Sequence, residues 1–99
     1  MSWRIDTSKR AEKFLEENHL AKQEVFELAQ RAIRYFKGER INVDIRKLKG
    51  RWRGFYRIRS GKLRIIVEFN FEDSVVSVEE IDWRGNVYYM DLPPLPVVT

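Results

Sequence analysis

The sequence predicts an α+β fold, in which a hairpin of two N-terminal helices packs on an antiparallel sheet of about four strands. Apolar residues recur at three- and four-residue spacing over residues 9–36, which is the period of an amphipathic helix. From Gly54 onward the period is two, as in strands with one buried face. Alternation at residues 3–7 adds a short strand before the helices. The 99 residues form one domain, because a chain of this length has room for a single core.

Each predicted helix carries its own boundary signals. Ser8 is an N-cap candidate before the first helix, residues 9–18, because its hydroxyl can accept a hydrogen bond from a free helical N–H group. Gly38 ends the second helix, residues 21–36, since glycine readily adopts the left-handed conformation that follows a helix. His19, between the helices, is interpreted as a cap or surface residue. The second helix has a broad apolar stripe made of Val25, Leu28, Ala29, Ala32, Ile33 and Phe36.

Three strands follow the change of period, at residues 55–59, 62–71 and 75–83. A turn at Ser60-Gly61 joins the first two strands, and a turn at residues 72–74 joins the next pair. The prolines of residues 91–99 exclude regular structure there, so we expect an extended tail. One face of the second strand should pack on the helices; its residues are Leu63, Ile65, Val67, Phe69 and Phe71.

The composition argues against several kinds of site and location. The chain has no Cys and a single His, so we expect neither a disulfide nor a metal site, and no cofactor. No apolar run approaches the roughly 20 residues that cross a bilayer. The N-terminus lacks the apolar segment of a signal peptide. We therefore expect a cytoplasmic protein.

Positive charge is concentrated in one segment of the chain. Between Arg46 and Arg64, nine of nineteen residues are Lys or Arg and none is acidic, whereas residues 65–99 carry one base and seven acids. Like charges held this close repel one another, and neutralisation of nucleic-acid phosphates is the usual reason to gather them. The sequence therefore predicts a nucleic-acid partner.

Strand pairing places part of this charge on one face of the sheet. With the turn at Ser60-Gly61, Arg59 pairs with Lys62 and Arg57 pairs with Arg64, so all four share a face. Directly opposed like charges destabilise a sheet, and a bound polyanion would relieve the repulsion. The alternative is a solvated basic face without a ligand. Glu68 has the same parity, and we expect it to hold an arginine by an ion pair.

Four motifs occur in order along the chain: Leu48-Lys49-Gly50, Gly54-Phe55-Tyr56-Arg57-Ile58-Arg59-Ser60-Gly61, Leu63-Arg64-Ile65-Ile66 and Trp83-Arg84-Gly85-Asn86-Val87-Tyr88. Each motif alone is weak, but their order and spacing resemble the RelE/ParE superfamily of bacterial and archaeal toxins. The resemblance covers most of the chain, including the helices and the N-terminal strand. It implies a compact domain with two helices on an antiparallel sheet.

The resemblance also implies a toxin that a co-expressed antitoxin neutralises, monomeric alone and hetero-oligomeric with the antitoxin. In RelE-type members the activity is cleavage of mRNA in the ribosomal A site without a metal, by attack of a ribose 2′-hydroxyl on the adjacent phosphate. Carried over by position, the catalytic residues are Arg57, Arg59, Arg64, Arg84 and Tyr88. Arginine binds phosphate strongly but is a poor proton shuttle, so we assign phosphate stabilisation to the arginines and the general-base role to Tyr88. Tyr89 is the alternative, because strand neighbours point to opposite faces.

The other members of the basic segment are predicted to bind RNA: Lys47, Lys49, Arg51, Trp52, Arg53 and Lys62. Trp52 either stacks on a base or packs on the helices. Two further functions stay open. Gyrase-directed ParE toxins share much of the strand pattern, and this chain has Arg57 and Arg59 where the best RelE enzymes have lysines. A catalytically inactive RNA-binding homologue is the third interpretation.

Overall fold

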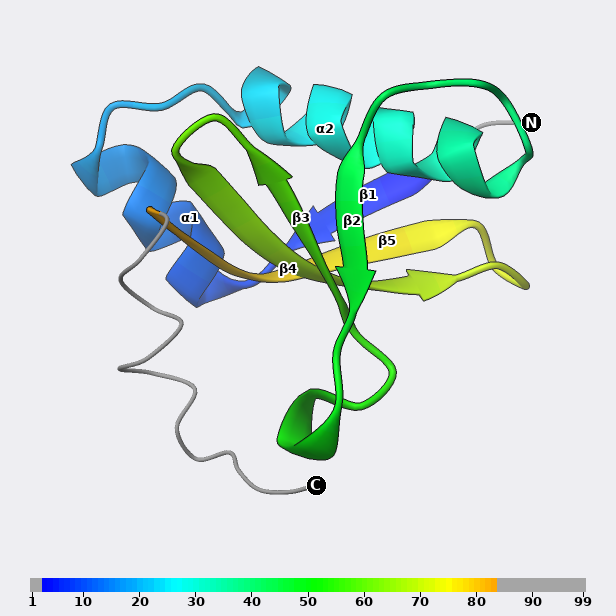
Figure 1. Cartoon of the computed structure of the whole chain (residues 1–99). Coiled ribbons are helices and arrows are strands. Elements are labelled where there is room, and N and C mark those ends of the chain that lie inside the picture. Colours follow the sequence, from blue (N-terminus) through cyan, green and yellow to red (C-terminus); the bar gives the residue numbers. More distant parts are fainter. Residues whose placement is uncertain (1–2, 84–99) are drawn as a thin grey trace.

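The computed structural model describes residues 3–83 of the chain. Two helices lie on one face of a five-stranded sheet (Figure 1), so the predicted α+β class is confirmed. No helix of the described part is both long and apolar enough to cross a membrane. In chain order the elements are β1 (Arg4–Thr7), α1 (Lys9–Glu17), α2 (Lys22–Phe36), β2 (Asp44–Lys47), the 3-10 turn η1 (Gly50–Trp52), β3 (Tyr56–Ser60), β4 (Leu63–Asn70) and β5 (Val75–Trp83).

The sheet differs from the expected one in two respects. Its strand order is β1-β5-β4-β3-β2, so β1 and β2 form opposite edges. The chain crosses from one edge to the other through the two helices, and β1 therefore runs parallel to β5, while the other pairs are antiparallel. The additional strand is β2. Its signal in the sequence is the alternation of Ile41, Val43 and Ile45 with polar residues.

The β3–β4 hairpin is two residues out of step with the register expected from the sequence. Arg59 pairs with Arg64 rather than with Lys62, and the two-residue turn is Gly61-Lys62. Gly61 has a φ of +60°, as the first position of a tight hairpin turn requires. Because side chains alternate with a period of two, a shift of two residues leaves every side chain on its predicted face.

The main core lies between the helices and the sheet. Ile58 and Ile65 face each other across β3 and β4 and are both fully buried. Such burial contributes about 1.5–3 kcal/mol per side chain, so this pair anchors the hairpin to the helices. Phe69 packs against the core, as expected, but Phe71 lies beyond the end of β4 and is 55% exposed. Its ring nevertheless contacts that of Phe36 on α2, with a centroid distance of 5.6 Å, so the predicted contact with the helices is confirmed although Phe71 is not buried.

The predicted helix ends are confirmed. The Ser8 hydroxyl accepts a hydrogen bond from the N–H of Ala11 at 3.0 Å and donates one to the carbonyl of Glu79 at 2.8 Å. It thereby caps α1 and ties it to β5. Gly38 follows α2 with a φ of +92°. His19 follows α1 as an exposed residue with a φ of +54°, which agrees with its interpretation as a surface or cap residue.

Candidate functional site

The sheet face opposite the helices carries a group of arginines from three neighbouring strands. We call Arg46, Arg57, Arg59 and Arg64 the arginine cluster. Arg59 pairs with Arg64 on β4, and Arg57 pairs with Arg46 on β2. The expected pairing of Arg57 with Arg64 is wrong, because Arg57 lies opposite Ile66. The three arginines predicted to be catalytic on β3 and β4 nevertheless share one face.

A carboxylate that the sequence analysis missed joins two of these arginines. Asp44, on β2, pairs with Arg59 in the sheet register. Its Oδ1 accepts a hydrogen bond from Nη2 of Arg57 at 2.9 Å, and its Oδ2 accepts one from Nε of Arg59 at 3.0 Å. Glu68, the acid expected in this role, is exposed and forms no ion pair with any residue between positions 3 and 83. The role of Asp44 could not be predicted because the sequence analysis predicts no strand at β2.

Arg57 is a buried member of the arginine cluster, and Asp44 is its ion-pair partner. Its side chain is 7% exposed, and no acceptor within residues 3–83 reaches its buried Nε atom. Burial lowers the pKa of Arg57 below its ordinary value; Asp44 opposes this effect, and the nearby charges of Arg59, Arg46 and Arg64 reinforce it. Arg57 and Arg59 thus share the Asp44 carboxylate. An additional anion at this face would meet attraction that water screens only weakly.

Acidic side chains of β5 border the cluster on its other side. Asp82 pairs with Arg64 in the register. Glu80 is 5% exposed, and its carboxylate accepts a hydrogen bond from Nη1 of Arg10 at 2.6 Å. The sequence pattern predicts a purely cationic face, but the register shows that the basic residues of β2, β3 and β4 adjoin an acidic strand, β5.

A register shift in β5 accounts for the position of Glu80. Ile66 pairs with Glu80, whereas Val67 pairs with Val78, so Glu79 is an extra residue on β5. An extra residue of this kind changes which side chains point to which face. Glu80 therefore lies on the face of the arginine cluster, while Val78 stays in the main core.

The residues predicted to bind RNA do not form one patch. Lys49, Arg51 and Arg53 are exposed in the connection from β2 to β3. Lys62 is exposed in the turn at the opposite end of β3. Lys47 pairs with Tyr56, so its register position belongs to the helix side of the sheet and not to the side of the arginine cluster. The β2–β3 connection is thus the denser basic surface.

Trp52 packs in a second, smaller core on the open face of the sheet. Its ring is edge-on to Phe55 with a centroid distance of 5.1 Å, and both rings lie against Leu48 and Ile66. The alternative of packing on the helices is wrong, because these residues lie on the other face. The indole Nε1 atom is buried, with no hydrogen-bond acceptor among residues 3–83. Trp52 is half-buried, so part of its ring remains accessible.

Several predicted functional residues lie outside the described residues, namely Arg84, Tyr88, Tyr89 and the tail at 91–99. Trp83, the last described residue, is edge-on to Phe14 at a centroid distance of 5.5 Å. Its Nε1 donates a hydrogen bond to Oδ1 of Asn18 at 3.2 Å, which fixes the end of β5 against α1.

Residues 3–83 contain no group of three or more His, Cys, Asp or Glu side chains placed to hold a metal ion.

Solved toxin structures share this fold. The chain is 28% identical to one in the archaeal RelE–RelB complex from Pyrococcus horikoshii, with a TM-score of 0.59 and coverage of 87% of this chain and 99% of that one. For the RelB–RelE complex from Methanococcus jannaschii, the identity is 24%, the TM-score 0.52 and the coverage 84% and 94%. For the Escherichia coli DinJ–YafQ toxin–antitoxin complex, the corresponding values are 14%, 0.60, 89% and 99%.

No protein-family model and no curated protein sequence matches the chain. The similarity is therefore one of structure, and the alignments to two of these toxin chains cover 87% and 89% of this chain and 99% of each of theirs. The predicted resemblance is confirmed at the level of the fold, which is that of the solved RelE-type toxins.

Proposed function

We propose that the chain is the toxin of a toxin–antitoxin pair and that it cuts mRNA on the ribosome. The observation that carries this proposal is the position of Arg57, Arg59 and Arg64 on one open face of β3 and β4. Support comes from the 28% identity to a chain of an archaeal RelE–RelB complex over nearly the whole of that chain. The partner is then an antitoxin that covers the basic face, and the site of action is the cytoplasm.

The proposed reaction needs no group beyond the RNA and protein side chains. The ribose 2′-oxygen forms a bond to the adjacent phosphorus, the bond from phosphorus to the 5′-oxygen breaks, and the 2′-hydroxyl proton passes to a general base. A proton returned to the 5′-oxygen completes the step and leaves a 2′,3′-cyclic phosphate. The arginines stabilise the charge on the phosphate oxygens, and loss of one such donor commonly costs about 100-fold in rate. Tyr88 is the proposed base, and Arg84 a further donor.

Arg59 is the proposed first contact for the phosphate. Its side chain is 31% exposed, whereas that of Arg57 is 7% exposed and lies deeper in the cluster. Asp44 holds both guanidinium groups in place before RNA binds. Since its own side chain is 47% exposed, it can rotate into water while a phosphate oxygen replaces it as acceptor.

A second candidate is a toxin without RNA chemistry, either gyrase-directed as in ParE or an inactive RNA-binding homologue. The observation that favours it is the ion pairing of Arg57 and Arg59 with Asp44, which neutralises part of the charge that a phosphate would need. In this case the open face is a protein-binding or RNA-binding surface.

The test is induction of the chain in growing cells, with translation and mRNA integrity followed over time. The proposal expects growth arrest with mRNA cut within translated codons, and expects Arg59→Ala, Arg84→Ala and Tyr88→Phe to reduce cleavage strongly. Arg40→Ala is the control, because Arg40 is exposed on the connection from α2 to β2. Unchanged cleavage in Arg84→Ala and Tyr88→Phe would show that the assigned site is wrong.

Two further assays separate the alternatives. Inhibition of purified gyrase with intact cellular mRNA identifies the ParE-like function. Binding of RNA with a steep salt dependence, without cleavage in a translating extract, identifies the inactive homologue.

A further inference from the structure

We propose that Arg10 on α1 and Glu80 on β5 are positioning residues of the arginine cluster, which together hold the guanidinium group of Arg64 toward the reacting phosphate. The catalytic part of this inference rests on the proposed function, whereas the contact between Glu80 and Arg64 is tested without it. The pair is the counterpart, on β5, of the carboxylate that Asp44 supplies on β2.

The start of α1 lies against β5 beside the extra residue, Glu79. β1 ends at Thr7, and the Ser8 hydroxyl that caps α1 donates a hydrogen bond to the carbonyl of Glu79 at 2.8 Å. Figure 1 shows α1 beside the end of β5, and the two elements are in contact. Arg10 is the second residue of α1, and its Nη1 donates a hydrogen bond to Oε1 of Glu80 at 2.6 Å. The helix cap thus brings a cation from the helix layer to a carboxylate of the sheet.

The Glu80 carboxylate is buried on the face of the arginine cluster. Its side chain is 7% exposed, whereas that of Arg10 is 70% exposed. A buried carboxylate is costly unless cations and hydrogen-bond donors surround it, and Arg10 supplies one such partner. The ion pair therefore keeps Glu80 charged and fixes the direction of its carboxylate at the border of the cluster.

Arg64 is a neighbour of Glu80 in the register of the sheet. Arg64 pairs with Asp82, and Glu80 lies two residues before Asp82 on the same face, which is the diagonal position. Diagonal side chains on neighbouring strands start about 7–8 Å apart, a distance that long side chains span. A carboxylate has two oxygen atoms, so Glu80 can bind Arg10 and Arg64 together. Asp82 is less suited, because its Oδ1 accepts the backbone N–H of the next residue at 2.6 Å.

The charges of this group leave Arg64 able to bind an anion. Two cations and one carboxylate carry one net positive charge, as they do where Asp44 bonds Arg57 and Arg59. A carboxylate that faced Arg64 alone would cancel its charge and compete with phosphate. Arg10 offsets the carboxylate from the solvent side, while Arg64 itself is 7% exposed. Arg64 is therefore held in one orientation without loss of its attraction for phosphate.

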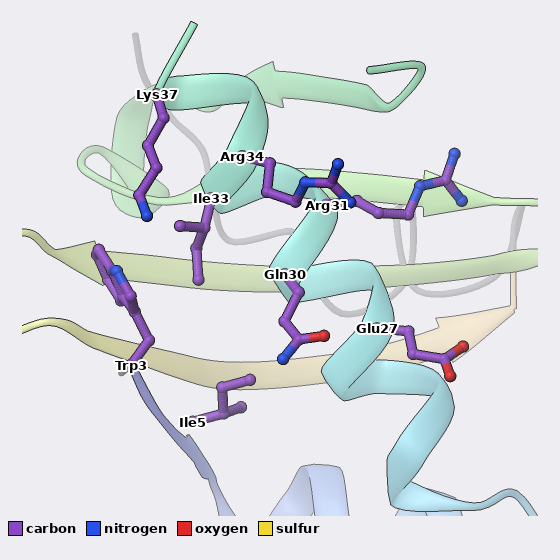
Figure 2. Close-up of a pocket in the computed structure, with 8 residues that line it drawn as sticks. All are labelled: Trp3, Ile5, Glu27, Gln30, Arg31, Ile33, Arg34 and Lys37. Carbon is purple, nitrogen blue, oxygen red and sulfur yellow. The ribbon is translucent and has the colours of Figure 1, made fainter. Parts of the chain in front are cut away.

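The arginines of α2 lie on the other side of the sheet. Figure 2 shows Arg31 and Arg34 on α2 beside a hollow of about 600 Å³ that Ile5 of β1 also lines. Ile5 packs against the main core, so this hollow is on the helix side. Arg34 forms its ion pair there with Glu39 at 2.8 Å. In the described helices, the arginine of α1 is therefore the one that bonds a carboxylate on the face of the cluster.

The test compares cleavage of mRNA in a translating extract with binding of a short single-stranded RNA. Arg10→Ala and Glu80→Gln should each lower kcat about tenfold or more and leave KM within about twofold, because they misplace Arg64 without removing a phosphate contact. The slope of log RNA affinity against log salt should stay unchanged. Arg10→Lys keeps a cation for Glu80 and should retain most of the rate. Lys9→Ala, exposed in the same turn of α1, is the control and should cleave like the unchanged chain.

A double variant separates positioning from folding. Arg10→Ala alone leaves a buried carboxylate without one of its partners, whereas Arg10→Ala combined with Glu80→Gln also removes the carboxylate charge. The double variant should unfold at nearly the same temperature as the unchanged chain. It should still lose about as much kcat as either single variant, because both residues act through Arg64. Independent losses that multiply in the double variant would contradict the inference.

The contact with Arg64 is measured apart from activity, in the full chain without RNA. The Nε–H group of Arg64 should exchange with water about tenfold faster or more in Arg10→Ala and in Glu80→Gln, and not in Lys9→Ala. The inference is overturned if this exchange or the cleavage rate is unchanged in both variants. It is also overturned if Arg10→Ala lowers the salt slope by about 1, since Arg10 would then contact a phosphate itself. An unchanged chain that does not cleave mRNA rejects the proposed function and the catalytic role, while faster exchange in the variants still establishes how Arg64 is held.

Discussion

The Asp44 carboxylate holds Arg57 in the sheet, with Oδ1 2.9 Å from Nη2 of a side chain that is only 7% exposed. Removal of the acid leaves a buried cation without this acceptor, and this costs more than the loss of a surface ion pair. Because Asp44 itself is 47% exposed, the cost is discounted from that of a fully buried pair.

The first prediction concerns this pair. A double-mutant cycle of Asp44→Asn and Arg57→Gln should give a coupling free energy of about 1–2 kcal/mol by urea unfolding. The same cycle at the exposed pair of Arg4 and Asp6 should give about 0.5 kcal/mol or less. Equal coupling in the two pairs would show that burial of Arg57 has no energetic effect.

The second prediction concerns RNA binding by Arg59. Arg59→Ala should weaken binding of a short single-stranded RNA and lower the slope of log affinity against log salt by about 1, because one phosphate contact is lost. Asp44→Asn should strengthen binding, since it removes a competing acceptor. Fluorescence anisotropy at several salt concentrations measures both effects, with Arg40→Ala as the control. Opposite behaviour of Asp44→Asn would mean that Asp44 is required to orient the arginines.

The third prediction separates packing from stacking at Trp52. Trp52→Phe keeps the contact with Phe55 and removes an N–H group that has no acceptor within residues 3–83, so unfolding free energy should change by less than about 1 kcal/mol. Trp52→Ala should lose about 2–3 kcal/mol. A base-stacking role adds a loss of RNA affinity of about 1–3 kcal/mol in the alanine variant. If RNA affinity is unchanged in both variants, Trp52 has only a packing role.

The fourth prediction concerns the core beneath the arginine cluster. Ile65→Ala should lower the free energy of unfolding by about 2–5 kcal/mol, because the side chain is fully buried between β4 and the helices. Ile65→Val should cost about 0.5–1.5 kcal/mol. Thermal or urea unfolding followed by circular dichroism measures both. A small effect of Ile65→Ala would indicate that the core around Ile58 is not closely packed.

The sequence predicts the helices well, because their boundaries depend on local chemistry. Ser8 and Gly38 mark helix ends through groups that lie within one turn of them. The face shared by Arg57, Arg59 and Arg64 was also predictable, since it depends only on alternation along two neighbouring strands. The turn between β3 and β4 is at Gly61-Lys62, one position later than predicted. This changes which residues of β3 and β4 are paired, but each side chain stays on its predicted face of the sheet.

The parts that were missed depend on contacts between distant segments. Asp44 reaches Arg57 only because β2 lies beside β3, and the short alternation of Ile41, Val43 and Ile45 does not by itself determine which strand β2 joins. The position of Glu80 depends on the register shift between β4 and β5, which local patterns do not reveal. The parallel pairing of β1 with β5 likewise joins segments about 70 residues apart.

Because β1 pairs with β5, the N-terminal strand cannot join the sheet until β5 has been synthesised. β5 lies between β1 and β4, so the last of the five strands to be synthesised is an interior strand of the sheet and the only described strand that joins β1 to the rest of it. A chain that stops before Val75 lacks the surface against which β1 and α1 are held. A premature stop codon or frameshift upstream of that point would therefore abolish the entire fold and not merely trim one edge from it.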